Sequence, residues 1–275
     1  MTTSLPCIAI VGAGSMGGAI LHGLLDSSVT VTGGIRVTNR SEAKAAVVRS
    51  AGVESFALEN TPDGNARAVK GAKVVMLGVK PHMIPDALAE LAPLLEPDAI
   101  VISVAGGVTT ARMEAIVDNV VLRAMPNTPA IVGKAVTGLS AGSRATDADL
   151  AIGRAVFETV GTVVETPESQ IDALSTISGS GPAYVFYFIE EFTRTAVDLG
   201  FTPEQALALV AGTFDGSLAL LAASASSPEQ LRKQVMSPNG TTERAVEQFQ
   251  AADLKSIFDR ATGAALARAK ELAAG

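Results

Sequence analysis

The sequence predicts an α/β fold: an N-terminal domain built on a parallel sheet, residues 1–165, followed by an all-α C-terminal domain, residues 166–275. From residue 7 to about 141, short β-branched apolar runs alternate with polar stretches of helical spacing. That alternation is typical of strands and crossover helices in a parallel sheet. After about residue 146, long Ala- and Leu-rich stretches with helical spacing take over.

Each element is predicted from its own pattern. Short apolar runs rich in β-branched residues predict the strands Cys7–Val11, Ile35–Asn39, Lys73–Val79, Ala99–Val104 and Val120–Met125; a later β-branched cluster occurs at Thr159–Val164. An amphipathic helix, Met16–Leu25, follows the first strand. Helical spacing with Ser, Thr, Pro or Asp at the start predicts the helices Gly181–Leu199, Thr202–Ala223, Pro228–Met236, Thr241–Gln250 and Leu254–Leu272.

The stretch Ala206–Ala223 is unusually apolar, with Asp215 as its only charge. A bilayer would have to accept that carboxylate in hydrocarbon, which is costly. We therefore expect this stretch to be buried in a helical core or in a subunit interface. A homodimer is expected, alone or as the building block of a larger ring.

Composition excludes several classes of function. A net charge of −7 and a pI near 5.0 provide no electrostatic footprint for nucleic acid or anionic lipid. One cysteine, Cys7, and two histidines, His22 and His82, predict neither a disulfide nor a metal site. No basic-then-apolar leader opens the chain, so we expect a cytoplasmic protein that does not enter a membrane.

A glycine-rich fingerprint follows the first strand and opens the first helix. Its residues are Gly12, Ala13, Gly14, Ser15, Met16 and Gly17. Glycines at this spacing let the backbone turn tightly and approach a pyrophosphate, which then meets the free N–H groups of the helix. The strand-turn-helix context predicts a Rossmann-type dinucleotide-binding domain rather than a glycine-rich turn without a ligand.

The end of the second strand indicates which dinucleotide binds. NAD-binding domains place a carboxylate there for the ribose 2′-hydroxyl, whereas this chain has Asn39, Arg40 and Ser41. The planar fork of an Arg suits a phosphate. We therefore predict NADP(H) as the preferred cofactor and leave NAD(H) open; the alternative is that Arg40 is only a solvated residue at a helix start.

Two further segments are expected at the carboxyl edge of the sheet, where ligands of this fold bind. Val79, Lys80 and Pro81 follow the third strand, and Ser103 and Ala105 precede a Gly-Gly pair after the fourth. Taken separately, Lys80 would be an ordinary surface charge and the Gly-Gly pair an ordinary turn. Together at one edge, they are predicted to line the nicotinamide half of the cofactor site.

A substrate site is predicted in the second domain. The segment Ser237–Thr242 reads as a turn that enters a helix, so its free N–H groups can hold a carboxylate without an arginine. The alternative is that Thr241 and Thr242 only cap the helix. The glycines and Pro182 of Ile177–Tyr184 are explained equally well by close packing and a helix start.

These segments together resemble one enzyme family. In chain order they read GAGSMGGAI, TNRS, GVKP, SVAGG, RAMPNTPA, ISGSGPAY and SPNGTT. The pattern is similar to pyrroline-5-carboxylate reductases nearly end to end. The resemblance implies NAD(P)H-dependent reduction of 1-pyrroline-5-carboxylate to L-proline, the last step of proline biosynthesis. It also implies that a partner subunit helps to complete the substrate site.

The resemblance assigns residues to roles. It places further cofactor contacts at Asn60 and, on the nicotinamide side, Gln234. It places substrate contacts at Ser237, Gly240, Thr241, Thr242 and Glu168. The family often has Gly where this chain has Asn239, and some members have Asn in place of Gln234.

A cyclic imine accepts hydride readily once it is protonated, so no strong buried acid is required. We expect the Thr242 hydroxyl to orient the ring nitrogen and assist proton delivery. A β-hydroxyacid dehydrogenase would need a catalytic lysine in the second domain, and this chain has no lysine between Lys134 and Lys233. A non-catalytic NADP-binding redox sensor would not need the loop Ser237–Thr242.

Overall fold

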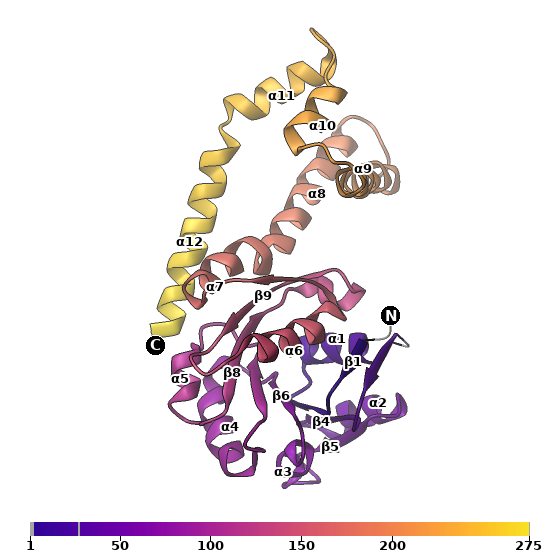
Figure 1. Ribbon diagram of the computed structural model, residues 1–275. Coiled ribbons are helices and arrows are strands. Elements are labelled where there is room, and N and C mark those ends of the chain that lie inside the picture. Colours follow the sequence, from indigo (N-terminus) through magenta and orange to yellow (C-terminus); the bar gives the residue numbers. More distant parts are fainter. Residues whose placement is uncertain (1–2, 27, 275) are drawn as a thin grey trace. The chain divides into compact units, whose positions relative to one another are not determined.

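The computed structural model describes residues 3–26 and 28–274. The chain forms two compact units (Figure 1). The first comprises the residues up to Ser180 together with those from Ala265 onward, and the second is Gly181–Ala264. The predicted combination of an α/β domain and an all-α domain is confirmed.

The first unit is built on an eight-stranded sheet. In pairing order, its strands are β10 (Gly161–Glu165), β9 (Ala135–Ala141), β8 (Val120–Met125), β7 (Ile100–Ser103), β6 (Val74–Leu77), β2 (Ile8–Val11), β4 (Ile35–Asn39) and β5 (Glu54–Ala57). All neighbours are parallel except β8 and β9. Strands β1 (Thr3–Leu5) and β3 (Val29–Val31) form a separate parallel pair.

Both faces of the large sheet are buried, which explains why its strands appear in the sequence as continuous apolar runs. Ile8 and Ile10 of β2 belong to one apolar cluster, whereas Ala9 and Val11 belong to another. Helices α1 (Ser15–Leu24) and α6 (Asp147–Glu158) contribute to the first cluster. Helices α3 (Gly64–Val69), α4 (Ile84–Leu91) and α5 (Thr110–Glu114) contribute to the second.

The compact units divide the chain at different places from the predicted boundary at residue 165. Helix α7 (Glu168–Leu174) stays with the sheet because Gly138 of β9 lies directly against it. A Cβ at Gly138 would be 2.7 Å from Leu174 Cδ2. The last part of α12 (Leu254–Ala274) also belongs to the first unit.

The second unit is helical, as predicted. It contains α8 (Gly181–Asp198), α9 (Pro203–Ala223), α10 (Pro228–Val235), α11 (Thr241–Ala251) and the first part of α12. Capping boxes begin two of these helices: Thr202 with Gln205 at α9, and Ser227 with Gln230 at α10. Each box satisfies backbone donors at both its positions, so these helix starts were readable from the sequence.

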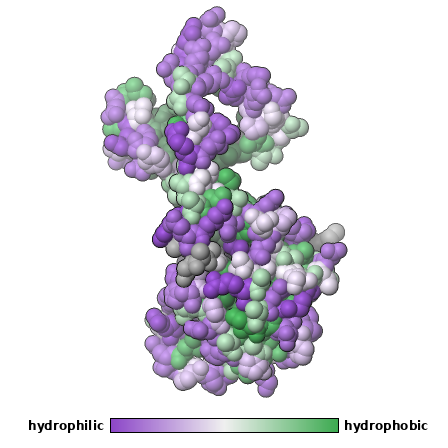
Figure 2. All heavy atoms as spheres, turned by 90° about the vertical axis from the view of Figure 1, so that its left-hand side faces the viewer, coloured by the Kyte–Doolittle hydropathy of each residue, from purple (hydrophilic) through white to green (hydrophobic). Residues whose placement is uncertain are grey.

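The second unit has little core of its own. Its fully buried apolar residues, among those described, are Ala196, Ala206 and Val210. Large apolar side chains of its helices are exposed instead, and Figure 2 shows apolar side chains on the surface of this unit. They include Phe186, Leu199 and Leu218, which are 61% to 76% exposed. Most of Ala206–Ala223 is therefore not buried in a core of the same chain.

Helix α9 has the length and apolar composition of a membrane-spanning helix, with only 11% of its most apolar window buried in the chain. Exposed apolar area of this kind marks a surface that another molecule covers. Of the two environments expected from the sequence, a subunit interface stays a prediction for this helix.

Candidate active site

The glycine-rich turn lies between β2 and α1, at the point where the sheet order reverses direction. From β2 the chain first adds β4 on one side and later returns to add β6 on the other. In α/β sheets, this is the crevice where ligands bind. The Gly12 and Ala13 N–H groups donate to the Thr38 carbonyl at 3.2 and 3.0 Å, and the Gly12 N–H also donates to Thr38 Oγ1 at 3.1 Å.

Gly12 is required by the fold itself. Its φ is +82°, a left-handed conformation that disfavours other residues. A Cβ there would lie 2.6 Å from Val79 Cγ1. The predicted cofactor residue Val79 is therefore packed against the first glycine of the fingerprint.

Gly14 is different, because nothing in the folded chain explains it. Its φ is −74°, and a Cβ there would have no heavy atom within 4 Å. Gly14 occupies the cap position of α1, where no side chain caps the helix and no acidic residue lies in the first turn. The open space faces an uncapped helix N-terminus, which is suited to a pyrophosphate.

The predicted ribose end lies at the carboxyl end of β4. Asn39 is buried, and its Nδ2 has no hydrogen-bond partner in the described structure. Such an orphaned donor costs free energy unless a ligand or water satisfies it. Arg40 is exposed and its side chain has no partner among the described residues, and Ser41 is the cap residue of α2 (Glu42–Ser50) without capping it through its hydroxyl.

A carboxylate that was not predicted from the sequence also lies at the ribose end of the site. Glu59 Oε1 accepts a hydrogen bond of 2.6 Å from the Glu42 N–H, in the first turn of α2. Asn60, a predicted cofactor contact, donates from Nδ2 to Glu42 Oε2 at 3.3 Å. The hydrogen bond from Arg49, with help from Asn60, lowers the pKa of Glu42.

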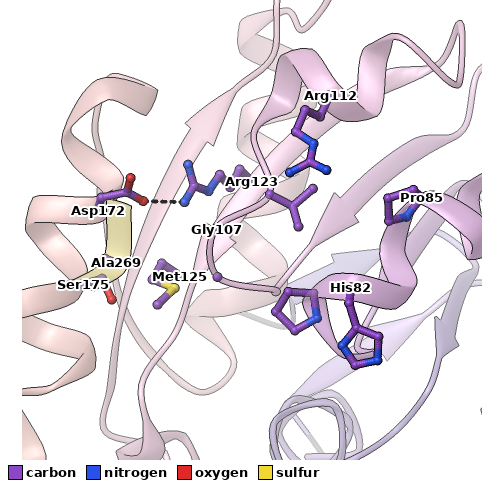
Figure 3. Close-up of a pocket in the computed structure, with 12 residues that line it drawn as sticks. His82, Pro85, Gly107, Arg112, Arg123, Met125, Asp172, Ser175 and Ala269 are labelled. Atoms are coloured by element: carbon purple, nitrogen blue, oxygen red, sulfur yellow. Dashed lines mark hydrogen bonds and ion pairs between the residues drawn. The ribbon is translucent and has the colours of Figure 1, made fainter. Parts of the chain in front are cut away.

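The predicted nicotinamide side borders a cavity of about 640 Å³ (Figure 3). Pro81, His82, Gly106, Gly107, Arg123 and Met125 are among its lining residues. Lys80 is exposed, and Ala105 is buried. Ser103 is fully buried, and its Oγ accepts the Ala105 N–H at 3.2 Å, so its hydroxyl shapes the turn after β7.

One wall of this cavity is held by a buried arginine. Arg123 of β8 is 3% exposed, and its guanidinium pairs with Asp172 at 2.6 Å and with Glu168 at 3.5 Å. Figure 3 shows the arginine directed at Asp172. Glu168 also accepts from the N–H and the hydroxyl of Thr110, both at 2.6 Å. The carboxylate predicted to bind substrate is thus used to fix α5 and Arg123 within the chain.

The glycine-rich segment ISGSGPAY, Ile177–Tyr184, begins in a π-helical turn, Ser175–Gly179, and continues into α8. Asn127 connects it to the sheet: its Nδ2 donates to the Ser178 carbonyl and its Oδ1 accepts the Val136 N–H, both at 2.9 Å. A π turn inserts an extra residue and is frequent at functional sites. Asn127 belongs to the segment RAMPNTPA, but no sequence pattern predicts the two contacts of its amide.

The predicted substrate loop lies entirely in the second unit. Its chain reverses through Asn239, which has a left-handed φ of 59°, and the Gly240 N–H donates to the Ser237 carbonyl at 2.9 Å. The Asn239 N–H donates to Glu243 Oε2 at 2.7 Å. Asn239 therefore takes a conformation that glycine adopts readily.

The start of α11 is open. Gly240 is its cap residue, and no side chain caps the helix. Thr241 and Thr242 are its first two residues, so their hydroxyls do not cap it and the capping-only explanation is wrong. The first N–H groups of a helix lack intrahelical partners, which leaves them available for an anion.

The sequence-predicted residues therefore form two groups in two different units. The cofactor set lies in the first unit, as does Glu168, whereas Gln234 on α10 and the loop Ser237–Thr242 lie in the second. The contacts of these residues with cofactor and substrate stay predictions.

Comparison with known proteins supplies the family context. Residues 168–272 match the family model for pyrroline-5-carboxylate reductase dimerisation. Residues 7–107 match the model for NADP oxidoreductase, coenzyme F420-dependent.

Full-length relatives agree with the domain matches. The pyrroline-5-carboxylate reductase of Corynebacterium melassecola is 35% identical, covering 96% of this chain and 98% of its own. That of Pseudomonas aeruginosa is 36% identical, covering 98% of each. The solved Coxiella burnetii enzyme has a TM-score of 0.88 at 36% identity, over 96% of this chain and 97% of its own. A Plasmodium falciparum pyrroline carboxylate reductase with NADP bound shares the fold, with a TM-score of 0.81, 24% identity and 97% coverage of both chains.

Proposed function

Because the chain belongs to the pyrroline-5-carboxylate reductase family, we propose that it reduces 1-pyrroline-5-carboxylate to L-proline, with NADPH as the preferred hydride donor. The resemblance predicted from its motifs is confirmed, and the protein is an NAD(P)-dependent oxidoreductase of proline biosynthesis. The observation that carries the proposal is the uncapped start of α11, entered by a tight turn through Asn239.

The first unit fits a dinucleotide. Gly14 leaves open space at an uncapped helix start, Asn39 has a buried donor without a partner, and Arg40 is exposed and unpaired in the described chain. These residues would hold the pyrophosphate and the ribose end, respectively. When bound, the dinucleotide supplies the hydride.

The second unit fits the substrate anion. The free N–H groups of Thr241 and Thr242, with the Ser237 hydroxyl, would hold the carboxylate of the imine. Thr242 is half-buried and its hydroxyl has no partner in the described chain, so the hydroxyl would be free to bond the ring nitrogen. A donor at that position orients the imine and assists its protonation.

The reaction is tested by mixing the purified protein with NADPH and 1-pyrroline-5-carboxylate and following the loss of NADPH absorbance. Turnover to proline supports the proposal. NADPH binding without turnover would favour a redox sensor, and oxidation of a β-hydroxyacid in a separate assay with NADP+ as the hydride acceptor would favour the other dehydrogenase class. The missing lysine between Lys134 and Lys233 argues against the latter.

The preference for NADPH is tested by replacing Arg40 with Asp. We expect KM for NADPH to rise about 10- to 100-fold, because a charge-assisted phosphate contact is lost and a repulsive charge is gained. KM for NADH should change far less, since NADH lacks the 2′-phosphate. Steady-state kinetics with both cofactors measures the difference, and equal effects on the two would contradict the assignment.

We further propose a homodimer joined through the helices of the second unit, with larger assemblies built from it. The apolar surface of α8 and α9 supports this, as does the match of residues 168–272 to a dimerisation domain. Light scattering of the purified protein should show a dimer or a multiple of it. A monodisperse, active monomer would refute the proposal.

A cytoplasmic location fits an NADPH-dependent enzyme with a single cysteine.

A further inference from the structure

The carboxylate of Glu59 lies at the start of α2, next to the residues predicted to bind a cofactor 2′-phosphate. Helix α2 begins directly after the predicted phosphate-binding residues Asn39, Arg40 and Ser41. A phosphate held by those residues would lie beside the first N–H groups of α2, which attract anions. Glu59 Oε1 already accepts the Glu42 N–H at 2.6 Å, so one of these donors is used by a charged group of the protein.

The position of Glu59 is fixed by the backbone and not only by its side chain. The Glu59 N–H donates to the Arg40 carbonyl at 3.2 Å, and the preceding Leu58 N–H donates to the Asn39 carbonyl at 2.9 Å. These bonds extend the pairing of β4 and β5 past the end of the strands. The backbone of Glu59 is therefore fixed next to the residues predicted to bind the phosphate.

A second carboxylate nearby is neutralised, whereas Glu59 is not. Glu42 pairs with Arg49 and accepts from Asn60. Among the described residues, the Glu59 carboxylate has no cationic partner and accepts only from the uncharged Glu42 N–H. Its negative charge is therefore available to repel a phosphate.

From this arrangement we propose that Glu59 is a cofactor-specificity residue, which limits the preference for NADPH by opposing the 2′-phosphate that Arg40 attracts. The inference rests on the proposed function only in requiring a nicotinamide dinucleotide at this site. NADPH binding has to displace the carboxylate from the start of α2 or accept its repulsion. NADH lacks the phosphate, so its binding requires neither displacement of the carboxylate nor repulsion by it.

The test is Glu59→Gln, which keeps an oxygen acceptor for the Glu42 N–H and removes the charge. We expect NADPH to bind about three- to tenfold more tightly, with little change for NADH, because a dianion close to one removed charge gains that much in a solvated site. Dissociation constants are measured by titrating nucleotide fluorescence without substrate. The gain should shrink in 0.5 M salt, which a purely structural effect would not do.

Glu54→Gln is the matched control. Glu54 is exposed at the opposite end of β5, where it is paired in register with Arg36, so the same charge is removed away from the phosphate residues. An unchanged or weakened NADPH affinity in Glu59→Gln, an equal gain for NADH, or the same gain in Glu54→Gln would each overturn the inference. Tight NADPH binding by a wild-type protein without reductase activity would instead refute the proposed reaction and leave this inference standing.

Discussion

Replacing Thr242 with Val should lower kcat and kcat/KM together, by about 10- to 100-fold, if one hydrogen bond to a charged group worth about 1.5–3 kcal/mol is lost in the transition state. Valine keeps the shape of threonine and leaves the backbone donors at the start of α11 in place. NADPH affinity should hardly change, because the fingerprint lies in the other unit. Steady-state kinetics, with NADPH binding measured separately, makes the comparison.

Ser237→Ala is the contrasting variant. A group that binds the substrate carboxylate equally in the ground state and the transition state should raise KM more than it lowers kcat. A Thr242→Val enzyme with wild-type kcat/KM would show that the hydroxyl takes no part. The proton would then come from water or from an imine already protonated in solution.

Gly14→Ala should weaken cofactor binding strongly while leaving the fold intact. The added methyl group meets no protein atom within 4 Å, and φ is −74°, so the free energy of unfolding should fall by less than about 1 kcal/mol. The methyl would occupy the space next to the pyrophosphate. Loss of one or two hydrogen bonds to that anion should raise the Kd for NADPH about 10- to 100-fold.

Gly12→Ala is the matched comparison, since it adds the same methyl group two residues earlier. There the methyl meets Val79 at 2.6 Å in a left-handed backbone. We expect it to destabilise the protein by about 2–4 kcal/mol. Thermal unfolding and NADPH titration of both variants separate the two effects. Unchanged NADPH affinity in a folded Gly14→Ala protein would place the pyrophosphate elsewhere.

Much of the fold could be predicted because each central strand carries its own signal. Strands such as β2 and β7 are buried on both faces and appear as unbroken apolar runs. Strand β9, AVTGLSA, could not be predicted because its small residues reflect tertiary packing. The side chain of Leu174, which lies 36 residues further along the chain, leaves no room for a Cβ at Gly138. No local pattern reveals such a contact.

The same distinction separates the site residues that were predicted from those that were not. The fingerprint Gly12–Gly17 is local, and its strand-turn-helix context could be read directly. Glu59 lies at the start of α2 through a contact with a residue 17 positions away, and Glu168 bonds Thr110 across 58 positions. The family resemblance therefore indicated Glu168, but neither Glu59 nor the partners that hold Glu168 could be predicted from the sequence.

In the proposed homodimer, the small core of the second unit makes the folding of this unit depend on protein concentration. With Ala196, Ala206 and Val210 as its fully buried apolar residues in the described structure, this unit leaves most of its apolar area for a partner to cover. When folding and association are coupled, stability rises with protomer concentration by mass action. For that dimer, we expect dilution to unfold first the helices that carry Thr242, while the sheet and its dinucleotide turn, which have an extensive core of their own, remain folded.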